Sequence, residues 1–117
     1  MHVSEKMQEC IQECKTCSQV CLENVTHCLE KGGMHAEPQH IRLLLDCAEI
    51  CQTSANFMIR GSDQHGRTCG VCADVCEACA DSCDTFANDA DMKRCAEVCR
   101  RCAQSCREMS GMTGMAH

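Results

Sequence analysis

The cysteines of this chain recur at the spacing of an α-helix. From Cys10 to Cys21 they follow one another at steps of four, three and four residues, and that alternation places side chains on one stripe of a helix. The stripe continues to Cys28, with Asn24 in the position between. The same spacing returns in three later segments, so all sixteen cysteines lie on helical stripes: Cys10, Cys14, Cys17, Cys21, Cys28, Cys47, Cys51, Cys69, Cys72, Cys76, Cys79, Cys83, Cys95, Cys99, Cys102 and Cys106. The pattern predicts four helices, each with a line of thiols along one face.

Capping and breaking residues give the expected ends of these helices. Ser4 is placed to cap the first helix, and Gly32 to end it. Pro38, the only proline of the chain, suits the first turn of the second helix, which ends at Gly61. The expected helices cover residues 4–31, 38–60, 63–87 and 89–110, and residues 111–117 form a flexible tail.

Helices of this length joined by short loops predict an all-α fold, an antiparallel up-down-up-down four-helix bundle with a cysteine-lined core. We expect residues 1–117 to form a single metal-storage domain. Leu, Ile, Val and Phe are few, and buried thiols would pack in their place. Aligning the stripes gives four expected layers across the core: Cys14, Cys51, Cys72 and Cys102; Cys17, Cys47, Cys76 and Cys99; Cys21, Leu44, Cys79 and Cys95; and Cys10, Ser54, Cys69 and Cys106.

Pairs of cysteines four residues apart suggest what the thiols bind. Seven such pairs occur, at 10/14, 17/21, 47/51, 72/76, 79/83, 95/99 and 102/106. Residues at this spacing have Cβ atoms about 5–6 Å apart, and two sulfurs sharing one ion lie on the order of 4–4.5 Å apart. Soft thiolates favour Cu(I), which accepts linear two-coordination, whereas Zn(II) prefers four ligands. We expect about 8 Cu(I) ions per chain with two thiolates each, and about 16 if every thiolate is shared.

Histidine and methionine residues near the bundle ends are expected to be weaker ligands than the thiolates. Met58, His65 and Met109 would gather at one end of an antiparallel bundle. His40 would lie near the opposite end. The imidazoles that look solvated, and to which no role is assigned, are those of His2, His35 and His117.

Charge and composition exclude several classes of function. A net charge of −6 disfavours nucleic acid, which needs a basic face. No apolar run is long enough to span a membrane, and the first residues lack the pattern of a secretory signal. The expected location is therefore cytoplasmic, where reducing conditions argue against a disulfide framework. No paired-carboxylate or Ser-His-Asp arrangement and no phosphate-binding loop can be placed, so we do not expect an enzyme.

Two cysteine-rich runs resemble a known family. They are CGVCADVCEACADSC from Cys69 to Cys83 and CAEVCRRCAQSC from Cys95 to Cys106. Together with the four cysteine-lined helices, they are similar to the bacterial copper storage proteins, over nearly the whole chain. The resemblance implies a four-helix bundle that binds many Cu(I) ions through its inward-facing cysteines, a homotetramer and the cytosolic branch of the family. It implies that all sixteen cysteines are ligands, and a copper chaperone or chelator would act as donor or acceptor. The second helix departs from the thiol pattern at Leu44 and Ser54.

Other interpretations remain open from the residues alone. The four-thiol layers suit a zinc or mixed-metal thiolate buffer, and the thiols of a redox protein would cycle through disulfides. Besides its cysteines, the first helix carries a second stripe that needs a partner, and a homo-oligomer interface on the outer faces of the first two helices would cover it. That stripe consists of Ile11, Ser18, Leu22, Val25 and Leu29.

Overall fold

The computed structural model describes residues 4–115 of the chain, with side chains described as far as Gly111. It contains four long helices and one short 3₁₀ helix, and no strand occurs in this described part. The elements are α1 (Glu5–Lys31), η1 (Gly33–Ala36), α2 (Pro38–Ile59), α3 (His65–Asp84) and α4 (Ala90–Met115). The predicted all-α fold is confirmed.

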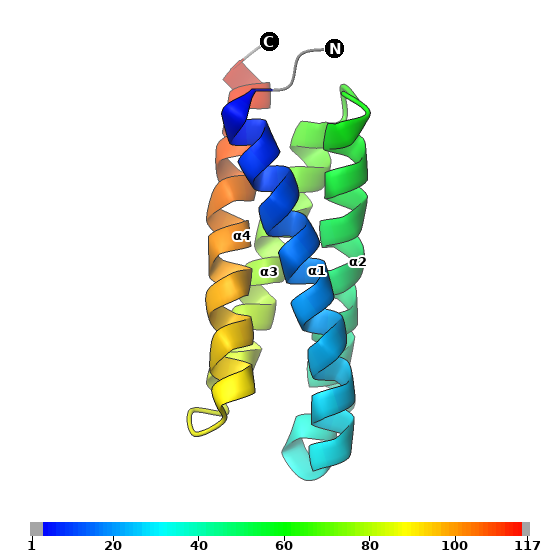
Figure 1. Ribbon diagram of the computed structural model, residues 1–117, viewed down its shortest axis with the longest axis vertical. Helices are drawn as coiled ribbons and strands as arrows, with labels where there is room; N and C mark the ends of the chain where they lie inside the picture. The colour runs from blue at the N-terminus through cyan, green and yellow to red at the C-terminus, as the bar shows by residue number, and fades with distance from the viewer. Residues whose placement is uncertain (1–3, 116–117) are drawn as a thin grey trace.

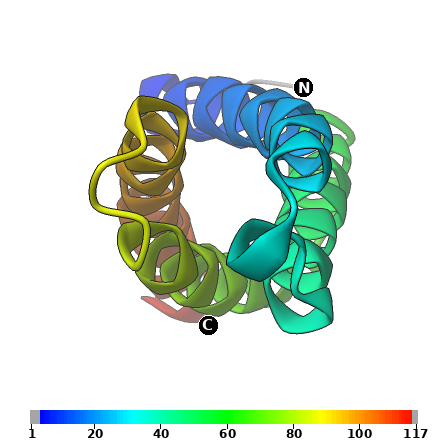
Figure 2. The same ribbon diagram turned by 90° about the horizontal axis from the view of Figure 1, so that it is seen from below.

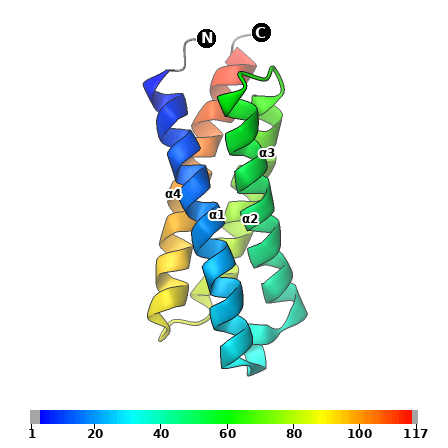
Figure 3. The same cartoon turned by 45° about the vertical axis from the view of Figure 1, so that its right-hand side comes forward.

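The four helices form an elongated antiparallel bundle of 46 × 21 × 19 Å (Figures 1 and 3). Each helix packs against its neighbours in sequence, and α4 packs against α1 to close the square. The end-on view in Figure 2 shows the four helices around a common axis, with no helix in the middle. Every helix therefore presents one face to a shared central line, where the cysteine stripes meet.

Local signals explain the ends of the first two helices. The Ser4 hydroxyl accepts a hydrogen bond of 3.1 Å from the backbone N–H of Met7, so the predicted N-cap is confirmed. Gly32 adopts a positive φ of 70° and its N–H donates to the carbonyl of Cys28, closing the last turn of α1. Pro38 is the first residue of α2, where its missing N–H costs nothing.

The third helix is shorter at both ends than the predicted 63–87. Gly61 has a φ of 67°, and the next residues form a turn in which the Ser62 hydroxyl accepts from the N–H of Gln64. The helix begins only at His65. At its other end, Thr85 donates its hydroxyl to the Ser82 carbonyl and the chain turns away. Turn-forming hydroxyls thus compete with the helix at each end.

The fourth helix corrects the predicted tail. It begins at Ala90, where the Asp89 carboxylate accepts from the backbone N–H groups of Asp91 and Met92. It then continues to Met115 instead of ending near residue 110. The glycines in its last turns lower helix propensity by only about 1 kcal/mol each, and they do not end the helix. Residues 116–117, the rest of the predicted tail, lie outside the described residues.

Small residues and surface ion pairs hold the bundle closed around its sulfur core. Six buried alanines flank the cysteine stripes: Ala48, Ala55, Ala73, Ala80, Ala96 and Ala103. On the outer face of α3 and α4, Arg100 lies within 3.0 Å of Asp81 and 2.7 Å of Asp84.

Among the described residues, no helix combines the length and apolar character needed to cross a bilayer.

Candidate metal centre

All sixteen cysteine side chains are buried in the bundle core, each with no exposed surface. Their sulfurs approach one another without bonding, because the contacts are 3.5 Å or longer whereas a disulfide bond is about 2.05 Å. All are free thiols. Sixteen buried thiols that face one another could hold soft metal ions, because thiolate sulfur is the softest ligand that proteins offer.

The thiols form a continuous series along the bundle axis. Neighbouring sulfurs in this series are 3.5–4.0 Å apart, and each contact joins two different helices. The order is Cys10, Cys106, Cys14, Cys102, Cys51, Cys76, Cys47, Cys17, Cys99, Cys21 and Cys95. An ion bound anywhere along this series has further thiols next to it.

The expected layers match these contacts. In the layer of Cys14, Cys51, Cys72 and Cys102, Cys51 lies 3.5 Å from Cys72 and 3.7 Å from Cys102. In the next layer, Cys17 lies 3.7 Å from both Cys47 and Cys99. The register that the sequence predicts for the middle of the bundle is therefore confirmed.

Groups of four thiols lie close enough to share one ion. In the following five of these groups, the sulfurs are within 4.8 Å of one another. Every one of these groups contains a Cys-x-x-x-Cys pair from one helix and single thiols from two other helices. The groups are Cys14, Cys72, Cys102, Cys106; Cys17, Cys21, Cys47, Cys99; Cys17, Cys47, Cys51, Cys76; Cys21, Cys79, Cys95, Cys99; and Cys51, Cys72, Cys76, Cys102. Because several cysteines belong to two groups, the geometry favours clusters with shared thiolates over isolated two-thiolate sites.

Burial and neighbouring sulfurs favour the protonated thiol at two core cysteines, Cys28 and Cys83. Burial raises the pKa of Cys28 from its ordinary value of 9.0 to about 11. The neighbouring sulfurs of Cys79 and Cys95, together with burial, raise the pKa of the Cys83 thiol as well. A metal ion that binds to these sulfurs as thiolates must displace their protons.

His40 joins the core at the end of the bundle formed by the last turns of α1. Its Nε2 lies 3.4 Å from the Cys28 sulfur, and its Nδ1 lies 2.7 Å from the Ser82 hydroxyl. Burial lowers the pKa of His40, which favours the neutral imidazole that binds metals. The Cys28 sulfur also contacts the Met92 sulfur at 3.6 Å. His40 thus lies beside a core thiol at this end of the bundle, and its role as a weaker ligand stays a prediction.

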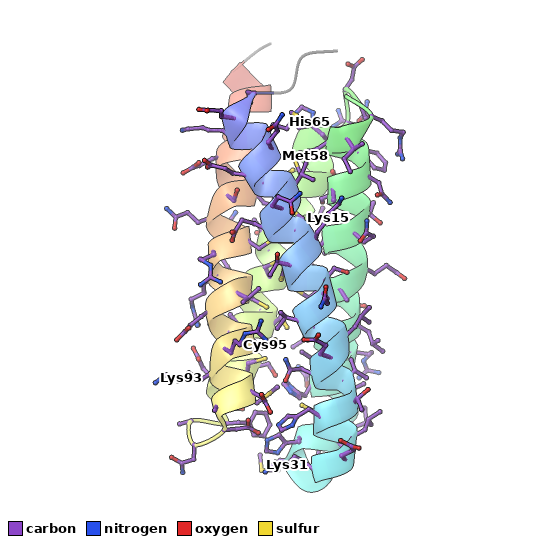
Figure 4. The ribbon with its side chains drawn as sticks, in the orientation of Figure 1. Lys15, Lys31, Met58, His65, Lys93 and Cys95 are labelled. Carbon is purple, nitrogen blue, oxygen red and sulfur yellow. The ribbon has the colours of Figure 1, made fainter. Side chains whose placement is uncertain are left out.

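The opposite end carries Met58, Met109 and His65. Met58 is buried, with its sulfur 3.8 Å from that of Cys69, and Met109 is buried in the same core. The Nδ1 of His65 lies 2.9 Å from the Ser62 carbonyl oxygen, to which it donates. Figure 4 labels Met58 and His65 next to each other at the upper end of the bundle. The predicted gathering of these residues at one end is confirmed for Met58 and His65.

Three positions interrupt the lines of thiols, in different ways. Asn24 donates from Nδ2 to the Val20 carbonyl at 2.9 Å, so its amide satisfies the helix backbone. Ser54 is fully buried, and its hydroxyl has no hydrogen-bond partner among residues 4–115. Leu44 is fully buried where a thiol would otherwise be expected.

The expectation that His35 is solvated is wrong. Its Nε2 lies 2.9 Å from an Asp89 carboxylate oxygen, and its ring packs on Phe86 with centroids 4.0 Å apart. No periodic pattern could reveal this, because η1 and the α3–α4 connection meet only in three dimensions. His2 and His117 lie outside the described residues.

Comparisons with known proteins agree with this geometry. Residues 3–111 match the profile of the family described as copper storage protein. A protein of Nitrosospira multiformis, Nmul_A1745, has a crystal structure with a TM-score of 0.86 and 47% identity, over 92% of this chain and 97% of that one. The Cu(I)-bound copper storage protein BsCsp3 gives a TM-score of 0.84 and 34% identity, over 91% of this chain and 99% of that one.

A cytosolic copper storage protein from Streptomyces lividans, holding five coppers, gives a TM-score of 0.80 and 33% identity over 92% of this chain and 93% of that one. The chain also shares 36% identity over 68 residues with an uncharacterized cysteine-rich protein of Bacillus subtilis, YhjQ. That match spans 58% of this chain and 63% of the relative.

Proposed function

The chain belongs to the copper storage protein family, and we propose that it stores Cu(I) in the cytosol as thiolate clusters inside a single four-helix domain. The observation that carries the proposal is the unbroken series of sulfur contacts through the core. A catalytic or electron-transfer site needs one or two metal centres, whereas this core offers ligands along its whole length. The sixteen cysteines act as the copper ligands.

Sharing of thiolates determines the capacity. A Cu(I) ion with two unshared thiolates carries a net charge of minus one, and such charges repel strongly in a core of low dielectric constant. When thiolates are shared until copper and sulfur are present in nearly equal numbers, that net charge is removed. We therefore place the capacity between about 8 and about 16 ions per chain, with the overlapping four-thiol groups as the first clusters to fill.

The ends of the core supply weaker ligands for copper exchange. His40 with Cys28 and Met92 lies at one end, and Met58, Met109 and His65 lie at the other. Imidazole and thioether bind Cu(I) less tightly than thiolate does, so ions held there would be the first to transfer to or from a copper chaperone or chelator. The protein acts on no substrate and is not an enzyme.

Exposed apolar side chains on α1 and α2 support assembly into a homotetramer. Leu22 and Leu29 on α1 expose 52% and 56% of their surface, and Leu45 and Ile59 on α2 expose 44% and 50%. They lie on the two helices that the sequence predicts to form the interface. Association of four chains through these side chains would remove them from water, and each Å² of apolar surface buried contributes about 25 cal/mol of favourable free energy.

Metal content in the cell tests the proposed function. Protein isolated anaerobically from copper-supplemented cells should contain several Cu(I) ions per chain and little zinc. Zinc in excess of copper under the same conditions would favour a zinc or mixed-metal buffer. A thiol count that falls reversibly on mild peroxide treatment, in protein without metal, would favour the redox protein.

A further inference from the structure

We propose that His27, His35 and Asp89 form a second metal site, outside the thiol core, for a divalent transition ion of the Zn(II) class. The Nε2 atoms of both histidines point at one oxygen of Asp89, Oδ2, from 2.8 Å and 2.9 Å. The three side chains are largely withdrawn from solvent, with 22%, 20% and 11% of their surfaces exposed. Three ligand atoms of the types that hold Zn(II) thus converge on one point.

The three residues come from separate elements, and each is held in place by a second contact. Asp89 lies in the α3–α4 connection, and its other oxygen caps α4 by accepting from the N–H of Asp91 and Met92. His35, in η1, packs its ring on Phe86 at 4.0 Å with an interplanar angle of 32°. The site is therefore preorganised without an ion, which lowers the entropic cost of binding.

The third residue, His27, shows the arrangement typical of a zinc-bound histidine. It lies near the end of α1, and its Nδ1 is 3.2 Å from the carboxylate of Asp91. Metal-bound histidines commonly donate their second ring N–H to a carboxylate, which leaves the opposite nitrogen free to bind the ion. Asp91 thus orients His27, and a bound ion would take the place of the proton that Nε2 donates to the Asp89 carboxylate.

The ligand set distinguishes this site from the core. Two imidazole nitrogens and a carboxylate oxygen suit borderline divalent ions, whereas Cu(I) prefers sulfur. Bonds of about 2.0–2.1 Å in a tetrahedral site put ligand atoms about 3.3 Å apart. The observed nitrogen-to-oxygen distances of 2.8 Å and 2.9 Å would have to lengthen by about 0.5 Å, and water can fill the fourth position.

Binding at this point would join the two connections at one end of the bundle. The α1–α2 connection carries His35 and the α3–α4 connection carries Asp89. In Figure 4, Lys31 and Lys93 label the helix ends on the two sides of this region. An ion here would hold the two halves of the bundle together next to Cys28 and His40, without using any thiol.

A titration of the copper-loaded protein tests this site, because Cu(I) then occupies the thiols. The protein used for this titration carries the substitutions His2→Gln and His117→Gln, which remove the imidazoles of its two ends. Zn(II) is titrated anaerobically against a chromophoric chelator, and Co(II) is used as its spectroscopic probe. We expect one ion per chain, unchanged copper content and a Co(II) spectrum without a sulfur-to-metal charge-transfer band.

Single substitutions identify the ligands. His35→Ala and Asp89→Asn should each weaken Zn(II) binding by more than about 100-fold, and Asp91→Asn by about 10–100-fold. Asn remains a good N-cap, so Asp89→Asn preserves the start of α4. Asp81→Asn, which removes an exposed carboxylate paired with Arg100, is the matched control and should leave Zn(II) binding unchanged. The proposal is overturned if no ion binds beyond the copper, if binding survives both His35→Ala and Asp89→Asn, or if the Co(II) spectrum shows thiolate ligation.

Discussion

Replacing Ser54 by cysteine should both stabilise the metal-free protein and enlarge its copper store. Ser54 is fully buried on the core face of α2, between Cys51 and Met58, and its hydroxyl has no partner within the described residues. A buried hydroxyl without a hydrogen bond costs about 1–3 kcal/mol. A thiol at this position is a weak donor that packs as a small hydrophobe, so Ser54→Cys removes most of that cost.

We expect a gain of about 1–2 kcal/mol in the free energy of unfolding. For a chain of this size, that gain raises Tm by roughly 4–8 °C, measured on metal-free protein under reducing, anaerobic conditions. The new thiol also extends the line of ligands on α2, so the copper capacity should rise by up to one ion per chain. An anaerobic Cu(I) titration against a competing chelator measures that increase.

Ser18→Cys provides the matched control. Ser18 is also a buried serine, but its hydroxyl donates to the Ala48 carbonyl at 2.8 Å. Its replacement loses a satisfied hydrogen bond, worth about 0.5–1.5 kcal/mol, and adds no thiol to the central line. If Ser54→Cys lowers Tm as Ser18→Cys does, or leaves the copper capacity unchanged, the reasoning about Ser54 is refuted.

Three further predictions follow from the core and the surface. The double variant Cys14→Ser, Cys17→Ser should remain helical by circular dichroism but bind fewer Cu(I) ions in titration; an unchanged stoichiometry would contradict the core sites. Because the folded-state pKa of Cys28 is raised from 9.0 to about 11, its neutral thiol stabilises the metal-free fold below about pH 9, and Tm should fall as the pH rises towards 11. Below that range Cu(I) affinity should increase with pH, by up to about tenfold per pH unit for each proton displaced; a pH-independent affinity would show that the ligands are already ionised. Leu22→Glu with Leu29→Glu should yield a smaller oligomer by light scattering at unchanged copper capacity per chain, whereas an unchanged mass would place the interface elsewhere.

Most of the fold and the thiol core could be predicted because both follow from one periodic pattern. The alternation of three and four residues places Cys51, Cys72 and Cys102 on facing stripes, and the short loops fix the antiparallel order that brings them together. Nothing in that argument depends on detailed side-chain packing. The same periodicity predicts the end positions of His40 and Met58.

The helix ends and the His35 contacts could not be predicted, because they depend on interactions that have no sequence period. The α3 helix loses its first residues to the turn at Ser62 and its last ones to the turn at Thr85. His35 reaches Asp89 only because η1 folds back against the α3–α4 connection. A four-residue segment such as Gly33–Ala36 gives no sign of such a contact.

An anaerobic Cu(I) titration of fully reduced protein tests the central claim most directly. The protein competes with a chelator for Cu(I), and zinc is run in parallel. Storage in shared thiolate clusters predicts tight uptake of about 8 to 16 Cu(I) per chain. Uptake of only one to a few Cu(I), with about four Zn(II) bound in preference, would contradict it.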